Sequence, residues 1–311
     1  MKTSPHADAL ERTWRWTYLA MCIAIFFFLV APVLVVVPLS FNAEPYFSFT
    51  QKMLALDPAG FSLRWYELLA EFGMARPDAP FSWDWLNDFW NNSTWLNAAK
   101  NSFFVGLCAT VLSTVLGTLA SLGMARQEMP FRRTITAILL APMIVPVVIV
   151  ATGLFFFYSN PCGILGFECG RLTSTYTGLI LAHTALGVPF VVITVKATLT
   201  GFDDTLARAA AGLGASPLRT FFKVVMPLIL PGVVSGALFA FATSFDEVVT
   251  VLFVGGPQQV TVPRQMWGGL REQVSPAILA AATILVLISV ALLTTVELLR
   301  RRSERLRGIR A

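Results

Sequence analysis

Six long apolar runs divide the chain, and each is long enough to cross a bilayer hydrocarbon core roughly 30 Å thick. An isolated apolar segment in lipid must be helical, because only a helix satisfies its own backbone hydrogen bonds. Prolines within the runs predict kinks at Pro32, Pro142, Pro146 and Pro189. The pattern predicts spans near Trp16–Leu39, Phe103–Gly123, Ile135–Tyr158, Thr175–Leu199, Gly232–Val254 and Ala277–Leu299.

Composition agrees with this membrane assignment. Of the 311 residues, 56% are hydrophobic and 13% are charged, whereas a soluble domain carries about 25% charged residues. The first run is too long for the core of a signal peptide and lacks a convincing cleavage site, so we expect a retained anchor.

The placement of Lys and Arg predicts the orientation of the spans. With both termini cytoplasmic, 16 of the 23 Lys and Arg residues fall on the cytoplasmic side, as the positive-inside rule requires. The net charge of +5 and the basic tail are therefore explained by topology, and no nucleic-acid partner is expected. The chain is expected to lie in a membrane and to cross it several times.

Two polar outer segments carry further expectations. The loop from Ser40 to about Ser102 contains five tryptophans and seven acids, which fits either an aromatic belt at the interface or a docking surface for an extracytoplasmic protein. Cys162 and Cys169 share a second outer loop, where an oxidising compartment would let them form a disulfide; two free thiols are the alternative. Cys22 and Cys108 lie within apolar runs.

The connection after the fourth run predicts a helix, a turn and a second short helix. Its alanine-rich stretch follows Asp203 and Asp204, either of which can cap a helix. Gly214 suits the left-handed position beyond the helix end. Ser216 is the predicted N-cap of the second helix, and Pro217 occupies its first helical position. Pro227 is expected near the end of this helix.

This connection resembles the "EAA loop" of binding-protein-dependent ABC importer permeases. The family pattern is Glu-Ala-Ala, three residues, Gly, nine residues, then Ile-x-Leu-Pro. The matching positions are Arg208, Ala209, Ala210, Gly214, Val224, Met226 and Pro227. Arg208 replaces the family's glutamate, so no ionic role is carried over. The resemblance implies that the loop, including Ser216 and Pro217, contacts the ATPase subunit.

Further segments are similar to polyamine-type permeases, above all to the C-type subunits of spermidine/putrescine importers. These segments are Ser40–Asn42, Phe61–Tyr66, Asn101–Ser102, Ser244–Glu247, Pro263–Trp267 and Ser275–Pro276. The resemblance implies an all-α membrane fold with six transmembrane helices, the type I ABC importer permease fold. It also implies a heteromer of two different permeases, two ATPase copies and one periplasmic substrate-binding protein, embedded in membrane lipid.

The expected domain organisation follows from these assignments. Residues 1–15 form a cytoplasmic tail, and residues 300–311 form a basic cytoplasmic tail. Residues 16–299 form the permease domain, with an outer loop over residues 40–102 and a coupling loop over residues 201–230.

Asp246 and Glu247 interrupt the fifth apolar run. Acids within a membrane span are costly and usually face a bundle interior or a water-filled path. In a continuous helix Thr243, Asp246 and Thr250 would share one stripe. We expect this stripe and Glu247 to attract a cationic amine, with Trp267 adding a cation–π contact. The alternative is structural pairing with Arg264, Arg271 or a partner subunit.

Motifs for independent chemistry are absent from the sequence. There is no phosphate-binding Gly-x-x-x-x-Gly-Lys-Ser/Thr loop, so ATP and Mg²⁺ are expected only in the partner ATPase. No metal motif occurs, and His183 is expected to make an interhelical hydrogen bond. Alternatives to a polyamine permease are an ABC permease for another amine, an amino-acid derivative or a phosphonate, an ion-coupled secondary carrier, and a scaffold or receptor without transport.

Overall fold

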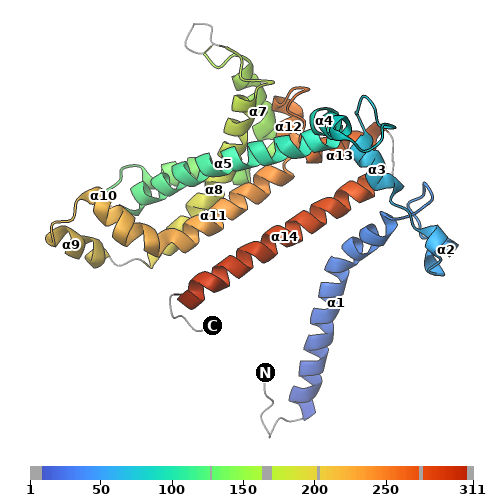
Figure 1. Ribbon diagram of the computed structural model, residues 1–311. Helices are drawn as coiled ribbons and strands as arrows, with labels where there is room; N and C mark the ends of the chain where they lie inside the picture. Colours follow the sequence, from blue (N-terminus) through green and yellow to red (C-terminus); the bar gives the residue numbers. More distant parts are fainter. Residues whose placement is uncertain (1–8, 127, 163–169, 202–203, 273–275, 307–311) are drawn as a thin grey trace. The chain divides into compact units, whose positions relative to one another are not determined.

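The computed structural model describes residues 9–126, 128–162, 170–201, 204–272 and 276–306. These residues are mostly helical (Figure 1). The helices are α1 (Ala9–Leu39), α2 (Gln51–Leu54), η1 (Pro58–Gly60), α3 (Arg64–Glu71), α4 (Trp83–Asn92), α5 (Thr94–Ala125), α6 (Arg132–Ile144), α7 (Val147–Ser159), α8 (Tyr176–Thr200), α9 (Asp204–Gly212), α10 (Pro217–Thr220), η3 (Phe221–Val225), α11 (Met226–Asp246), α12 (Val249–Val254), α13 (Val262–Glu272) and α14 (Ala277–Leu306).

The chain forms two compact units, one of Met1–Phe72 with Gly269–Ala311 and one of Gly73–Gly268. In the second unit α5, α8 and α11 run side by side. Glycines allow their close approach: a Cβ on Gly117 would lie 2.7 Å from the Val191 Cβ, and one on Gly236 would lie 2.8 Å from the Val191 Cα. Small residues thus take the place of bulky side chains at these helix contacts.

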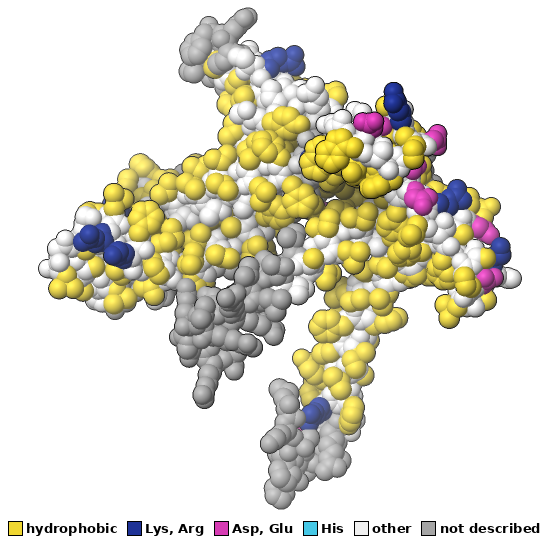
Figure 2. All heavy atoms as spheres, in the orientation of Figure 1, with side chains coloured by type: hydrophobic (Ala, Val, Ile, Leu, Met, Phe, Trp, Pro, Cys, Tyr) yellow, Lys and Arg dark blue, Asp and Glu magenta, His cyan; other side chains and the backbone are white. Residues whose placement is uncertain are grey.

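In the first unit, α1 and α14 contact each other. In the most apolar 18-residue part of Thr13–Leu39 in α1 no residue is buried, and Leu39 at the helix end is the buried exception. Figure 2 shows hydrophobic side chains along nearly all of the visible surface of α1. A helix that is apolar all round requires lipid or another protein for its covering.

Four single helices among the described residues have the length and composition of a membrane span: Thr13–Leu39, Thr94–Ala125, Tyr176–Thr200 and Pro217–Asp246. These correspond to the predicted spans one, two, four and five. The sixth predicted span lies in α14, whose described apolar part is Ala277–Ala291. The multi-span helical prediction is therefore confirmed, with an approximate count of six.

The third predicted span is wrong in its shape. The sequence predicted one kinked helix over Ile135–Tyr158, but α6 and α7 meet at an angle of 107°. Val145 is extended, and Pro146, with a φ of −52° and a ψ of 130°, is also non-helical and precedes the first residue of α7. Proline disfavours helical backbone at the residue before it, so the pair Val145–Pro146 ends one helix and starts another.

The predicted outer loop over residues 40–102 is also more ordered than a loop. It contains α2, η1, α3, α4 and the first turns of α5. The serines at 82 and 93 cap α4 and α5 by accepting hydrogen bonds from the backbone N–H groups of Trp85 and Leu96.

Candidate functional site

The connection between α8 and α11 folds into the predicted helical hairpin (Figure 1). Gly214 has a φ of +80°. Two hydrogen bonds close the end of α9, from Gly214 N–H to the Ala211 carbonyl at 2.9 Å and from Ala215 N–H to the Ala210 carbonyl at 3.1 Å. This is the Schellman pattern, which needs a left-handed residue at the position of Gly214.

The start of the second helix also follows its sequence signals. The Ser216 hydroxyl accepts a hydrogen bond from Arg219 N–H, and Pro217 occupies the first turn of α10. Ser216 and Pro217 thus have the N-cap and first-turn positions that the sequence predicted. Asp203 lies outside the described residues, while Asp204 is the first residue of α9.

The expected short second helix is wrong in its length. The chain continues as helix from Pro217 through η3 and α11 to Asp246. Pro227 lies in the first turn of α11 and not at a helix end. In η3, Met226 N–H donates to the Phe221 carbonyl, five residues back. Such a π segment admits a proline, whose missing N–H leaves a normal helical bond unmade.

The tip of the hairpin is exposed and partly apolar. Leu213 is 90% exposed, Leu218 72% and Phe222 62%. A Cβ on Gly214 would meet no atom within 4 Å. Arg208 and Ala209 are exposed and Ala210 is half-buried. Figure 2 shows basic side chains gathered at the α9–α10 end of this unit. Exposed apolar side chains with a basic rim are typical of a protein contact surface.

The acid pair lies at a helix break. The backbone is extended at Glu247, so α11 ends at Asp246 and α12 begins at Val249. The predicted stripe of Thr243, Asp246 and Thr250 along one helix is therefore wrong. The Glu247 Oε1 accepts the Thr250 N–H at 2.9 Å, and this capping bond starts α12.

The surroundings of the break differ for each residue. Asp246 is exposed, Glu247 and Thr243 are half-buried, and Thr250 is fully buried. The Thr250 hydroxyl has no hydrogen-bond partner among the described residues. Trp267, on α13, is 46% exposed. Asp246 is thus available to a solute, whereas Glu247 already holds a backbone group.

The alternative of pairing with Arg264 finds no support. Arg264 donates from Nη1 to the Gly256 carbonyl at 2.8 Å. Within the described ranges no salt bridge joins Asp246 or Glu247 to Arg264. The half-buried guanidinium of Arg264 holds the loop that follows α12.

His183 makes the predicted interhelical hydrogen bond. Its Nδ1 lies 2.7 Å from the Ser244 Oγ, which joins α8 to α11 two residues before Asp246. The ring is 1% exposed, and Nε2 has no partner among the described residues. The chain therefore holds a buried polar contact directly before the helix break.

A polar cluster that the sequence analysis did not single out as a site holds the loop from Gly255 to Thr261. Asn101 Nδ2 donates to the carbonyls of Gln258 and Val260, at 2.8 and 2.9 Å. The Tyr176 hydroxyl donates to Asn101 Oδ1 at 2.8 Å, and the Ser102 hydroxyl accepts from Val262 N–H at 2.9 Å. The pair Asn101–Ser102 was the available sequence signal; its partners lie about 160 residues away and could not be read from the sequence.

Hydrogen bonds also join the segment Ser40–Asn42 to the segment Phe61–Tyr66. The Trp65 indole N–H donates to the Asn42 carbonyl at 2.7 Å, and the Ser40 and Tyr66 hydroxyls lie 2.7 Å apart. Asn42 and Phe61 form an isolated antiparallel bridge. These residues therefore stabilise the chain where it leaves α1.

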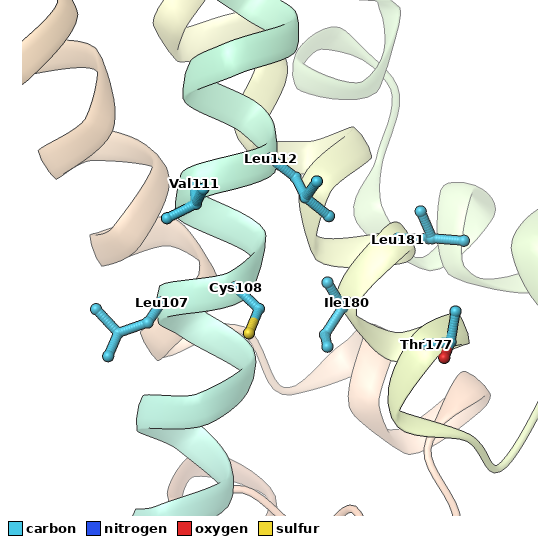
Figure 3. A pocket seen from close by; sticks show the side chains of 7 residues that line it. All are labelled: Leu107, Cys108, Val111, Leu112, Thr177, Ile180 and Leu181. Atoms are coloured by element: carbon cyan, nitrogen blue, oxygen red, sulfur yellow. The ribbon is translucent and has the colours of Figure 1, made fainter.

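An apolar cavity of about 540 Å³ lies between α5 and α8 (Figure 3). No charged side chain and none of the predicted substrate-path residues line this cavity. The lining residues are Leu107, Cys108, Val111, Leu112, Thr177, Ile180 and Leu181. Such a lining cannot replace the hydration of a polycation. We therefore exclude this cavity as the substrate site.

The remaining predicted pair, Cys162 and Cys169, is not tested, since residues 163–169 lie outside the described part of the chain. The bridge stays a prediction. Among the described residues no group of three or more potential metal ligands comes together.

Comparison with known proteins decides the family. The model for "Binding-protein-dependent transport system inner membrane component" matches residues 113–306. The chain belongs to this family. It is a permease subunit of an ABC importer and a multi-pass membrane protein.

Individual relatives agree with this assignment. The chain is 31% identical to the spermidine/putrescine permease protein PotC of Haemophilus influenzae, over 72% of this chain and 84% of that protein. It is 32% identical to the putrescine permease protein PotI of Escherichia coli, over 84% of this chain and 82% of that protein.

A solved structure supports the fold. The chain superposes with a TM-score of 0.61 on a chain of a bacterial alginate ABC transporter, solved in complex with an alginate pentasaccharide-bound periplasmic protein. The match covers 97% of each chain at 16% identity, so it supports the permease fold and not the substrate.

Proposed function

We propose that this permease forms half of the translocation path for a polyamine such as spermidine or putrescine. The relatives PotC and PotI carry these substrates in their names. The single structural observation in favour is Asp246, an exposed acid at the end of a 30-residue apolar helix. A carboxylate at such a position attracts an amine, and the exposed face of Trp267 adds a second contact of the kind that ammonium groups prefer.

The two acids have different roles in this proposal. Glu247 holds the start of α12, so its carboxylate adds mainly long-range attraction. Asp246 contacts the amine directly. Thr243, which is half-buried, would border the path before the break, whereas the fully buried Thr250 would support the start of α12 from behind.

Uptake of labelled spermidine into proteoliposomes containing the whole complex and ATP tests the proposal. The double variant Asp246→Asn with Glu247→Gln should lower uptake at least about tenfold, because a charge pair 4 Å apart is worth about 4 kcal/mol in a partly dry cavity. Asp246→Asn alone should account for most of the loss. Glu11→Gln, an exposed acid in the first turn of α1 and outside the outer loop, is the control for removal of one acid.

Wild-type uptake in the double variant would contradict the proposal and leave both acids with structural roles. Assembly of the complex and its ATP hydrolysis should be measured in the same preparations, so that a folding defect is recognised.

We further propose that the hairpin from α9 to α10 docks on a partner ATPase. Its exposed tip and its Schellman turn support this role. The contact would comprise Arg208, Ala209, Ala210, Gly214, Ser216 and Pro217, with Pro227 inside the helix behind it. ATP and Mg²⁺ would bind in that partner, and this chain would supply no catalytic residue.

The wider assembly is proposed from the family resemblance. It comprises two ATPase copies, a second and different permease, and a periplasmic substrate-binding protein in a bacterial inner membrane. Both termini would lie in the cytoplasm, with the outer loop over residues 40–102 facing the binding protein. The coupling loop would then extend over residues 201–230 and the basic tail over residues 300–311.

A further inference from the structure

A second cavity lies between the start of α6 and the last turns of α8. Its volume is about 390 Å³, and its lining consists of Arg132, Arg133, Thr136 and Lys196. Three of these four side chains are cationic, and none is acidic. Arg132 and Lys196 are half-buried, while Arg133 is exposed. Three positive charges facing one partly desolvated cavity repel each other unless an anion lies between them.

The start of α6 adds to this positive character. Phe131, with a φ of +53°, precedes the helix and its side chain accepts no hydrogen bond from the first turn. The first N–H groups of a helix without a cap favour an anion. The Thr136 hydroxyl is already used, since it donates to the Arg132 carbonyl at 2.8 Å. The anion would thus be held by the three cations and the helix start.

Apolar residues continue from the cavity along both helices. Ile193 lies one turn from Lys196 on α8 and is 42% exposed. On α6, Met143 and Ile144 lie on the same helix face as Arg132 and Arg133, and they are 52% and 78% exposed. A ligand that fits both parts carries a phosphate at one end and hydrocarbon at the other.

We propose that this cavity binds the phosphate of an anionic phospholipid, with the acyl chains along Ile193, Met143 and Ile144. Basic pockets between membrane helices suit such head groups. A polyamine is excluded here by charge, so the site is separate from the substrate path and does not depend on the proposed function. The lipid would fix the start of α6 against the end of α8, directly before the connection that carries α9.

Native mass spectrometry of the assembled complex in detergent tests this site. The complex is titrated with dioleoyl phosphatidylglycerol, with dioleoyl phosphatidylcholine, or with inorganic phosphate. Each cation near a membrane surface strengthens the binding of an anionic lipid about fivefold, which corresponds to a free energy of about 1 kcal/mol. The variant Arg132→Gln with Lys196→Gln should therefore bind phosphatidylglycerol about 25-fold more weakly.

The control variant removes the same charge elsewhere. Arg126 and Arg171 are exposed and line neither cavity. Arg126→Gln with Arg171→Gln should change the affinity less than twofold. Equal losses in the two double variants would overturn the proposal, because they would indicate unspecific attraction. Phosphatidylcholine binding as tightly as phosphatidylglycerol would also overturn it.

Two further arms keep the test decisive. Inorganic phosphate that binds as tightly as the lipid would overturn the lipid assignment, whereas failure of millimolar phosphate to compete supports it. If the double variant does not assemble, Lys196→Gln alone should weaken binding about fivefold, and Arg132→Lys should keep most of the affinity. Unchanged affinity in Lys196→Gln would overturn the proposal.

Discussion

The turn between α9 and α10 and the break between α11 and α12 interrupt helices in opposite ways. In the turn, the hydrogen bonds of Gly214, Ala215 and Arg219 reach partners within five residues, and the surroundings are open. At the break, Ser244 is held by His183 from 61 residues away, and Thr250 is fully buried. The turn is therefore encoded by its own residues, whereas the break depends on α8.

This contrast predicts that changes in the turn act on coupling and leave the fold intact. Gly214→Val places a β-branched residue at a φ of +80°, which such residues very rarely adopt. The Schellman turn should reorganise, and substrate-stimulated ATP hydrolysis by the complex should be lost, while the permease stays in the membrane.

Gly214→Asn provides the matched control for this prediction. Asparagine tolerates the left-handed region, and the space around Gly214 is open, so this variant should keep most of the stimulation. The Gly214→Asp variant has a side chain of the same size as asparagine but adds a charge at the contact. It should again abolish the substrate-stimulated ATP hydrolysis. Full stimulation in the valine variant would remove the turn from the proposed ATPase contact.

The break should respond to loss of its capping bond. Glu247→Ala removes the acceptor for the Thr250 N–H and should destabilise the complex by about 1 kcal/mol, the usual cost of losing a cap. Glu247→Gln keeps a carbonyl oxygen at the same place and should cost less. Thermal unfolding in detergent measures both variants, and equal losses would mean that the charge matters more than the cap.

The hydrogen bond between Ser244 and His183, which supports the break from α8, should also contribute to stability. Ser244→Ala leaves both ring nitrogens of buried His183 without partners and should cost about 0.6 kcal/mol, the average for interhelical hydrogen bonds in membrane proteins. Ser159→Ala is the control, because the Ser159 hydroxyl donates to the Phe155 carbonyl within its own helix. An equal or larger loss at Ser159 would contradict a special role for the His183 contact.

The smallest expected effect concerns Asp88, an acid that holds backbone outside the spans. Hydrogen bonds from the Asn92 side chain and the Arg76 and Ala75 N–H groups lower the pKa of Asp88 below its usual value. Because the folded pKa is lowered, the stabilisation is present above the unfolded pKa and is lost as pH falls through the folded pKa.

Hydrogen exchange of the Ala75 and Arg76 amides should therefore lose its protection only under acidic conditions. In Asp88→Asn this dependence should vanish. If the amides of the Asp88→Asn variant still lose their protection in acid, another group causes the loss. Asp88 would then not hold the backbone of the outer segment in the way that Glu247 holds the start of α12.

The same contrast explains what the sequence could predict. Gly214, Ser216 and Pro217 follow capping rules that act over a few residues, so their positions were correct. The break at Glu247 was not predicted, because an apolar run contains no proline or glycine there and the acid caps α12 only in the folded chain. The polar cluster around Asn101 could not be predicted either, since its partners are distant in sequence.

The unbroken helix from Pro217 to Asp246 has a mechanical consequence. It extends over 30 residues, which is roughly 45 Å at 1.5 Å per residue. Gly232 and Gly236 bring its middle against α8, where a Cβ would lie 2.4 Å from the hydroxyls of Thr198 and Thr194. If a helix of this length pivots about the contact at its middle, a tilt of about 5° moves each end by about 2 Å, in opposite directions. A push on the turn at Gly214 would thus reach Asp246 as a movement of similar size and opposite sense.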